Sequence, residues 1–349
     1  MAAVSFPDPA RLADAHALAA LTGPIRSLAR SPLATVGTTG ARHERLALTL
    51  ESGEQRRLVL KRLRLSTDWT ALRTEDRRGR EAAMLAEGEL AAMWDAIACP
   101  YLAFAADEDD VALLMDDLTP HLFRDVRESL ADEEEERLLG ALASLHARFW
   151  GSPALGSPWL ARPEQHAGML DARCAADAAA RAVLPEPMRE HVVRGWAAAL
   201  EMAPPAVASM LRRPAAELAP LRSGLPSTLL HGDAKVANFA LLPDGRVAAF
   251  DWALIGAGPA TIDVGWYLAV NATRLARSKE QALSRYRTLL EPKLDSPLSD
   301  ALWEALVRFG VVVGARMLLW SKALAVQADR PGARAEWTWW IERLEAACG

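Results

Sequence analysis

The stretch from His231 to Asp251 constrains the fold of this chain more than any other. It reads His-Gly-Asp-Ala-Lys-Val-Ala-Asn, followed by two short apolar runs that are separated by a Pro-Asp-Gly turn. Two apolar runs joined by an Asp-Gly turn predict a β-hairpin. A hairpin holds groups near its two ends, so we expect the side chains of Asp233, Asn238 and Asp251 to lie in one region.

These three side chains offer hard oxygen ligands and one free carboxylate. In proteins Mg²⁺ is usually held by one or two carboxylates together with substrate phosphates. Taken alone, Asn238 or Asp251 is better explained as an ordinary polar loop residue. The joint pattern, with polar positions at fixed spacing around two expected strands, is better explained by a phosphate and metal site.

The order His231-Gly-Asp233, four residues, Asn238 and then Asp251-Trp resembles the motif of the aminoglycoside phosphotransferase and choline kinase group. That group shares its fold with protein kinases, which carry His-Arg-Asp, four residues, Asn and later Asp-Phe-Gly, and which catalyse in-line phosphoryl transfer. The resemblance implies that Asp233 is the base that orients the acceptor hydroxyl. Lys235 would face the transferred phosphoryl group, and Asn238 and Asp251 would bind metal.

Residues 33–65 predict three antiparallel strands, over 33–36, 46–50 and 58–63. The first two flank a loop that contains Gly37 and Gly40. By resemblance this loop covers the nucleotide phosphates, because backbone N–H groups approach anions where no side chain intervenes. The loop lacks the full Gly-x-Gly-x-x-Gly and the Gly-Lys-Ser/Thr ending of a P-loop, which counts against a P-loop NTPase.

Lys61 stands among aliphatic residues on the third expected strand. Such a lysine is usually an edge-strand or snorkelling residue. Kinase-like folds, however, need a strand lysine on the α- and β-phosphates, paired with a glutamate from the next helix. We expect that helix from Glu81 to Trp94, with Glu81 as the partner and Glu87 as the alternative.

The apolar run that starts at Val111 predicts a buried strand leading into a polar connector. By resemblance the connector is the hinge whose backbone groups hydrogen-bond the adenine. We therefore expect an N-lobe over residues 1–115 and a C-lobe over residues 116–349, the latter with a helical acceptor-binding insert at 164–222. The expected hinge residues are Met115, Asp116, Asp117 and Leu118.

Two further helices are predicted in the C-lobe. One extends from Glu133 to Trp150, and the other begins near Thr261. By resemblance, Asp263 at the start of the second helix braces the catalytic loop by accepting its N–H bonds. The chain carries no long activation segment with an Ala-Pro-Glu motif, which favours small-molecule acceptors over proteins.

The composition of the 349 residues, 51% hydrophobic and 24% charged, is that of an ordinary globular protein. A net charge of −5 argues against a nucleic-acid partner. No uninterrupted apolar stretch approaches the length of a membrane span, and three cysteines without metal-ligand spacing suggest reduced thiols. We therefore expect a cytoplasmic protein without a membrane or nucleic-acid partner; its oligomeric state cannot be read from the sequence.

Together these features predict an α+β, bilobal protein-kinase-like fold, with a small antiparallel-sheet N-lobe carrying one helix and a larger, mainly helical C-lobe. By resemblance the protein binds ATP or GTP with Mg²⁺ and phosphorylates a hydroxyl of a small molecule: an antibiotic, as in antibiotic resistance, a sugar or an amino alcohol. The insert at 164–222 has seven acidic residues and seven arginines, which favours a neutral or singly charged acceptor. A nucleotide-binding pseudokinase and a metal-dependent phosphohydrolase remain the alternatives.

Overall fold

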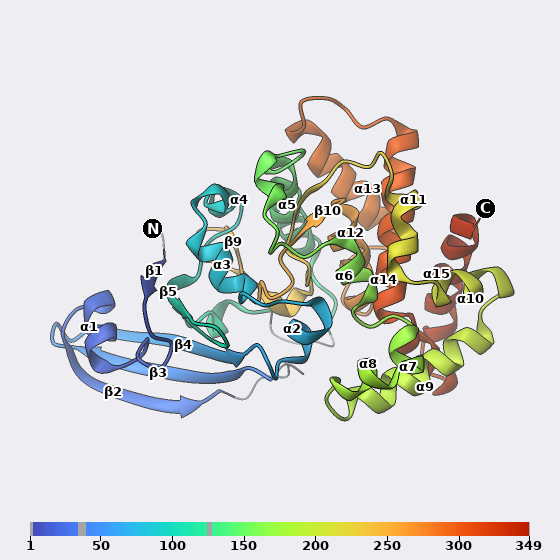
Figure 1. Cartoon of the computed structure of the whole chain (residues 1–349). Helices are drawn as coiled ribbons and strands as arrows, with labels where there is room; N and C mark the ends of the chain where they lie inside the picture. The colour runs from blue at the N-terminus through green and yellow to red at the C-terminus, as the bar shows by residue number, and fades with distance from the viewer. Residues whose placement is uncertain (1–2, 34–39, 124–127, 349) are drawn as a thin grey trace.

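A six-stranded sheet forms the N-terminal part of the protein, at the left of Figure 1. The structure, a computed structural model, describes residues 3–33, 40–123 and 128–348. The strand order is β1-β5-β6-β4-β3-β2; β1 pairs with β5 in parallel and the other neighbours are antiparallel. The strands are β1 (Val4–Phe6), β2 (Ile25–Pro32), β3 (Arg42–Leu50), β4 (Gln55–Arg64), β5 (Tyr101–Ala106) and β6 (Asp110–Asp116).

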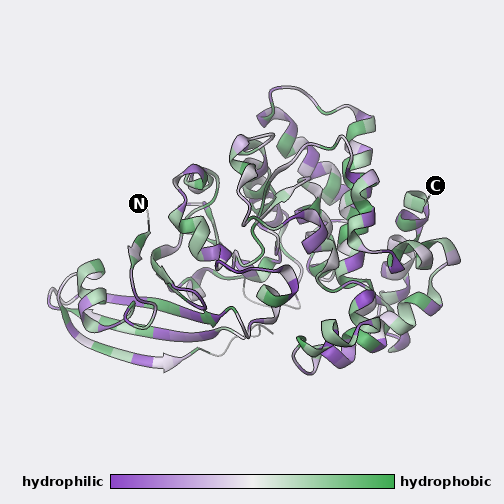
Figure 2. Ribbon diagram, in the orientation of Figure 1, coloured by the Kyte–Doolittle hydropathy of each residue, from purple (hydrophilic) through white to green (hydrophobic). Residues whose placement is uncertain are grey.

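The alternation of side chains along β4 decides which face of the sheet Lys61 occupies. Successive residues of a strand point to opposite faces. Leu58 and Leu60 are buried in the cluster that includes residues of helix α1 (Ala15–Thr22), whereas Val59 packs in the main core that includes helix α3 (Arg80–Ala86). Figure 2 shows the corresponding bands of hydrophobic and hydrophilic residues along the long strands. Lys61, two positions after Val59, therefore shares the face on which α3 lies.

The strands expected at 46–50 and 58–63 are confirmed as β3 and β4. The strand expected at 33–36 falls mostly outside the described residues, and the strand found before the glycine loop, β2, lies earlier and ends at Pro32. Sequence reasoning missed β2 because it is an edge strand whose residues are largely exposed, so it lacks the apolar pattern of a half-buried strand.

The single helix expected from Glu81 to Trp94 is wrong. Helix α3 ends at Ala86, a 3₁₀ turn follows over Gly88–Leu90, and α4 (Met93–Ala96) is a separate short helix. Glu87 has extended backbone angles, φ −90° and ψ 109°, and its carboxylate bonds with Ser157 and Trp159. The glycine after it lowers helix propensity, so the chain turns here instead of continuing the helix.

The C-terminal part is mainly helical and lies at the right of Figure 1. The hairpin expected after Asn238 is confirmed as β8 (Phe239–Leu241) and β9 (Val247–Ala249), and β7 (Thr228–Leu230) pairs with β10 (Gly256–Gly258). The helices expected from Glu133 and from Thr261 are confirmed as α5 (Asp132–Arg148) and α12 (Thr261–Val270). The others are α13 (Lys279–Leu290), α14 (Asp300–Gln327), α15 (Ala333–Cys348) and, in the insert, α6 (Pro163–Gly168), α7 (Arg173–Ala176), α8 (Ala178–Ala182), α9 (Met188–Met202), α10 (Pro205–Arg212) and α11 (Ala219–Arg222).

Helices α12 and α14 approach one another at glycines. A Cβ added to Gly310 would lie 2.1 Å from the carbonyl oxygen of Thr261, and one added to Gly265 would lie 2.0 Å from the carbonyl oxygen of Gly310. Side chains at these positions would separate the two helices.

Among the described residues α14 is the one helix long and apolar enough to cross a membrane, and 61% of its most apolar window is buried within the protein. Its contacts with α9, α12 and α15 account for that apolar surface.

A buried histidine, His166 on α6, packs beside the loop that contains the His-Gly-Asp sequence. Neither ring nitrogen has a hydrogen-bond partner. A Cβ added to Gly232 would lie 2.7 Å from Cε1 of His166, and one added to Gly256 would lie 2.6 Å from its Nε2. Gly232 also has φ +82°, so both backbone angle and space require glycine there. Burial lowers the pKa of His166 to about 4, although the charge of Asp263 acts in the opposite direction.

We predict that Gly310→Ala lowers the free energy of unfolding by about 1–3 kcal/mol, because the added methyl group meets backbone that cannot rotate away. Denaturant unfolding measures the change. Gly140→Ala is the matched control, since it is also a helical glycine but has open space around its Cβ position. It should be neutral or stabilising by up to about 1 kcal/mol. Equal stability of the two variants would contradict the close α12–α14 contact.

We also predict that His166 makes stability depend on pH. Its pKa is about 4 in the folded state and about 6.5 in an unfolded chain. The folded state thus binds fewer protons, so the stabilisation is complete above pH ~6.5 and is lost as pH falls towards ~4, by about 3 kcal/mol in total. Unfolding curves of His166→Leu should lose this part of the slope, while the exposed control His191→Asn keeps it. Parallel pH profiles for wild type and His166→Leu would refute the assignment.

Candidate active site

Three N–H donors converge on the carboxylate of Asp233, in the loop that follows β7. Lys235 Nζ lies 2.6 Å from Oδ2, and Asn238 Nδ2 lies 3.0 Å from the same oxygen. The indole Nε1 of Trp266 lies 2.7 Å from Oδ1. The structure therefore brings together three residues of the predicted site, and it adds Trp266, which sequence reasoning missed.

Helix α12 holds the backbone of this loop. The carboxylate of Asp263 accepts the N–H of His231 at 2.7 Å and the N–H of Gly232 at 2.8 Å, which confirms the bracing expected of it. At the other end of the helix, the side-chain oxygen of Asn271 accepts the N–H of Val236 at 2.9 Å, and its amide donates to the carbonyl of Ala234. Asn271 was also missed. The signal was present, because Asp263 and Asn271 flank a run of seven largely apolar residues.

Asp263 is itself held from a second side. Nε2 of His146 lies 3.1 Å from its Oδ2, and Nδ1 of the same ring lies 2.6 Å from the hydroxyl of Tyr286. Burial alone would raise the pKa of Asp263, but the hydrogen bonds that it accepts from His146 and from the Gly232 N–H outweigh burial and keep the pKa below its ordinary value. The loop therefore rests on a carboxylate that stays ionised at neutral pH.

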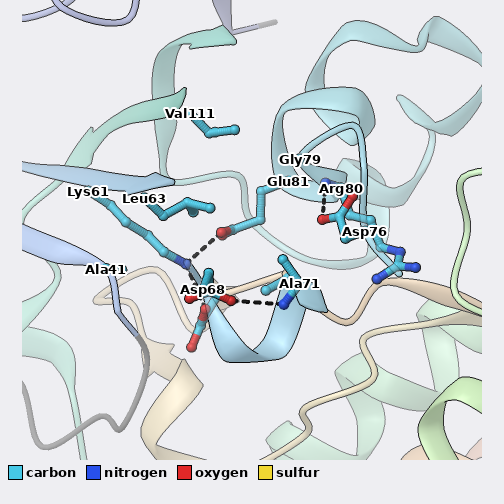
Figure 3. Close-up of a pocket in the computed structure, with 12 residues that line it drawn as sticks. Ala41, Lys61, Leu63, Asp68, Ala71, Asp76, Gly79, Arg80, Glu81 and Val111 are labelled. Carbon is cyan, nitrogen blue, oxygen red and sulfur yellow. Dashed lines mark hydrogen bonds and ion pairs between the residues drawn. The ribbon is translucent and has the colours of Figure 1, made fainter. Parts of the chain in front are cut away.

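Lys61 bridges two carboxylates that come from distant parts of the chain. Its Nζ lies 2.5 Å from Oε2 of Glu81 and 2.7 Å from Oδ1 of Asp251. Figure 3 shows Lys61 and Glu81 pointing towards one another across a small pocket. Glu81 also accepts hydrogen bonds from the Tyr101 hydroxyl and the Trp252 N–H. Of the two glutamates considered for Lys61, the structure pairs it with Glu81.

The ionisation of this trio follows from burial and neighbouring charge. Burial opposes the charged form of Lys61, yet the charges of Asp251 and Glu81 raise its pKa above the ordinary value. For Asp251, burial acts to raise the pKa, and the charges of Lys61 and Lys235 overcome this and lower it. Asp251 has φ +63°, a left-handed conformation that is uncommon outside glycine. Its carboxylate is thus held ionised in a strained turn at the end of the hairpin.

Asp251 joins the two sets of residues. Its Oδ1 contacts Lys61, and its Oδ2 lies 3.9 Å from Nζ of Lys235. The amide nitrogen of Asn238 is committed to Asp233, so the oxygen is the atom that Asn238 offers to a cation. No group of three or more His, Cys, Asp or Glu suited to a metal occurs in the described ranges. The donors present fit a hard cation that takes its remaining ligands from phosphate and water.

Of the two loop glycines expected to cover the phosphates, Gly40 belongs to the described residues. Gly40 lies next to Asp68, whose side chain caps helix α2 (Trp69–Thr74) through the N–H of Ala71, as Figure 3 shows. Gly37 lies outside the described residues. Asp68 also lines the pocket beside Lys61.

The expected hinge follows β6. Met115 and Asp116 complete that strand, the N–H of Asp116 donates to the carbonyl of Pro100, and the N–H of Asp117 donates to that of Arg57. Neither N–H is therefore available to a nucleotide base. The carboxylate of Asp117 is held by Arg45 at 2.9 Å, which ties the segment to β3. Leu118 follows these two residues, whose N–H groups are bonded within the protein.

Comparison with known proteins supplies the family. The model of a phosphotransferase enzyme family, APH, matches residues 38–310. No curated protein sequence matches this chain.

Solved structures similar to this chain include choline kinase LicA from Streptococcus pneumoniae, at 14% identity and TM-score 0.47, covering 95% of this chain and 97% of that one. A Plasmodium vivax ethanolamine kinase has 12% identity and TM-score 0.49, covering 95% and 84% of the two chains. Aminoglycoside phosphotransferase APH(3'')-Id from Streptomyces rimosus has 16% identity and TM-score 0.42, covering 85% and 96%.

The family match spans most of the chain and includes the whole His231–Asp251 stretch, Lys61 and Asp263. The expected α+β fold class, with a largely antiparallel sheet and a mainly helical C-terminal part, is confirmed. The chain belongs to the phosphotransferase enzyme family, and it is a small-molecule kinase.

Proposed function

We propose that this enzyme transfers the γ-phosphoryl group of ATP, or of GTP, to a hydroxyl of a small molecule with the help of Mg²⁺. The proposal rests mainly on the contacts of Asp251. Its carboxylate lies next to Lys61 from the sheet and near Lys235 from the loop that contains Asp233. A lysine and a metal-binding carboxylate must converge on the phosphates in this chemistry. Here they lie within 2.7 Å although 190 positions separate them in sequence.

On the nucleotide side, Lys61 would contact the α- and β-phosphates while Glu81 fixes its direction. The glycine loop with Gly37 and Gly40 would cover the phosphates. Since two hinge N–H groups are engaged within the protein, the base would meet Leu118 and the hinge carbonyls. We propose residues 1–115 as the nucleotide-binding lobe and residues 116–349 as the lobe that holds the hinge, catalytic loop and acceptor insert.

On the transfer side, Asp233 would accept the proton of the acceptor hydroxyl, and Lys235 would face the moving phosphoryl group. Asn238 and Asp251 would hold the cation through their side-chain oxygens. When bound, Mg²⁺ supplies positive charge that offsets the charge on the phosphate oxygens. The protein supplies position and fixed charges, which carry most of the catalysis in this reaction class.

The insert indicates which acceptors fit. Its acidic and basic residues balance in number, and several acids are already paired with arginines. These pairs are Glu164–Arg222, Asp171–Arg316, Glu186–Arg189 and Glu190–Arg194. A paired carboxylate attracts a distant cation weakly, so the insert favours a neutral or singly charged acceptor over a polycation.

We predict that substitutions on the two sides of the site have different effects. Asp233→Ala should lower kcat by about 10²–10⁴-fold, the range for a lost general base, while nucleotide affinity is retained. Lys61→Met should instead weaken ATP binding by roughly 10-fold or more, since a charged phosphate contact is lost. Isothermal calorimetry with an ATP analogue and initial rates measure both. The exposed Lys293→Ala is the control. Identical profiles for the first two variants would contradict the division of roles.

We also predict a weak effect of salt on acceptor recognition. Raising ionic strength from about 50 to about 200 mM should change acceptor KM by less than about twofold, because few unpaired charges attract the acceptor. The assay uses a panel of neutral and singly charged alcohols, with an aminoglycoside as the polycation, and detects the added phosphoryl group by mass spectrometry. A steep salt-dependent loss of kcat/KM with the aminoglycoside would show that acidic residues outside the insert shape the acceptor site. If the enzyme released phosphate from ATP at a rate that did not depend on any acceptor, the phosphohydrolase alternative would be favoured.

A further inference from the structure

The hydrogen bonds of Asp233 are distributed unequally between its two oxygens. Oδ2 receives Lys235 at 2.6 Å and Asn238 at 3.0 Å, whereas Oδ1 receives only the indole N–H of Trp266, at 2.7 Å, among the contacts of the described residues. An ionised carboxylate has about four lone-pair sites, two on each oxygen. Both sites of Oδ2 are thus occupied by the loop itself. One site of Oδ1 is occupied by Trp266, and one stays open.

The indole belongs to the element that already fixes the loop. Trp266 lies on α12, three residues after Asp263, so the backbone of the loop and the carboxylate of Asp233 are held by the same helix. The Trp266 side chain is almost fully buried, with 6% of the residue exposed. It therefore supports Asp233 from the protein side and presents little surface to a substrate.

We propose that Trp266 is a positioning residue that turns Oδ1 of Asp233 towards the acceptor hydroxyl. The inference rests on the proposed phosphotransferase function. In the transfer step the hydroxyl oxygen forms a bond to the γ-phosphorus, and its proton moves to the open site of Oδ1. The bond between the γ-phosphorus and the bridging oxygen breaks, and its electron pair leaves with the nucleoside diphosphate. Without the indole N–H, the carboxylate is held only through Oδ2, by Lys235 and Asn238, so Oδ1 is directed less firmly.

The geometry allows a test that separates the N–H from the bulk of the ring. Trp266→Phe keeps an aromatic ring but has no donor. Trp266→His loses more bulk than Trp266→Phe, yet its Nε2 takes the place of the indole Nε1, because the imidazole overlays the five-membered part of the indole. Trp320→Phe is the matched control, since that indole donates to the backbone carbonyl of Met317, on its own helix α14.

We expect Trp266→Phe to lower kcat by about 10- to 100-fold, the usual effect of losing a group that orients a catalytic residue. The KM for nucleotide and acceptor should change little, and thermal unfolding should show that the variant is folded. Trp266→His should recover part of the lost kcat, and Trp320→Phe should match wild type. In an Asp233→Ala background, Trp266→Phe should cause no further loss, because the two residues act as one unit.

A spectroscopic readout tests the contact without reference to turnover. Among the indole resonances of the 12 tryptophans, that of Trp266 is identified by its absence in Trp266→Phe. It should move upfield in Asp233→Ala, because the hydrogen bond to the carboxylate is lost. An unmoved resonance, or a kcat of Trp266→Phe within about twofold of wild type, would overturn the inference. Full activity of Asp233→Ala would instead overturn the proposed role of Asp233, and wild-type enzyme inactive in both transfer and hydrolysis would overturn the proposed function.

Discussion

The shape of the catalytic loop depends on hydrogen bonds from one helix. Asp263 accepts two loop N–H groups, Asn271 satisfies one N–H and one carbonyl, and Trp266 reaches the carboxylate of Asp233. Polar backbone groups buried without such partners would destabilise the fold. Helix α12 is in turn fixed against α14 where glycine lets the two backbones meet. The position of Asp233 is therefore set by the packing of two helices as well as by its own loop.

The second constraint is the charge balance around Lys61. A buried ammonium group is costly to remove from water unless good partners replace the lost hydration. Glu81 and Asp251 provide them, and Tyr101 and the backbone of Trp252 satisfy the remaining oxygen of Glu81. The charge of Lys61 is thus balanced by protein groups alone. These contacts fix the positions and the charged forms of Lys61 and Asp251, which is the preorganisation that the proposed function requires.

The sequence was most informative where chemistry requires fixed spacing. The hairpin, the helix at Thr261 and the bracing by Asp263 followed from local pattern or resemblance, and the Lys61–Glu81 pair was the favoured of two choices. Edge strand β2 has too few buried residues to show a pattern. At the break after Ala86 the local signal, Gly88, is weak, and Glu87 is held outside the helix by contacts with residues some 70 positions away. No role could be assigned to Trp266 from the sequence, because only the tertiary fold reveals what its N–H meets.

A crystal structure with a non-hydrolysable ATP analogue and Mg²⁺ would show whether α12 holds the loop around Asp233 in one conformation when nucleotide binds. We expect phosphates next to Lys61, a cation on the oxygens of Asn238 and Asp251, and unchanged bonds from the loop to Asp263 and Trp266. Phosphates bound away from Lys61, or a loop that leaves Asp263 when nucleotide binds, would contradict this expectation.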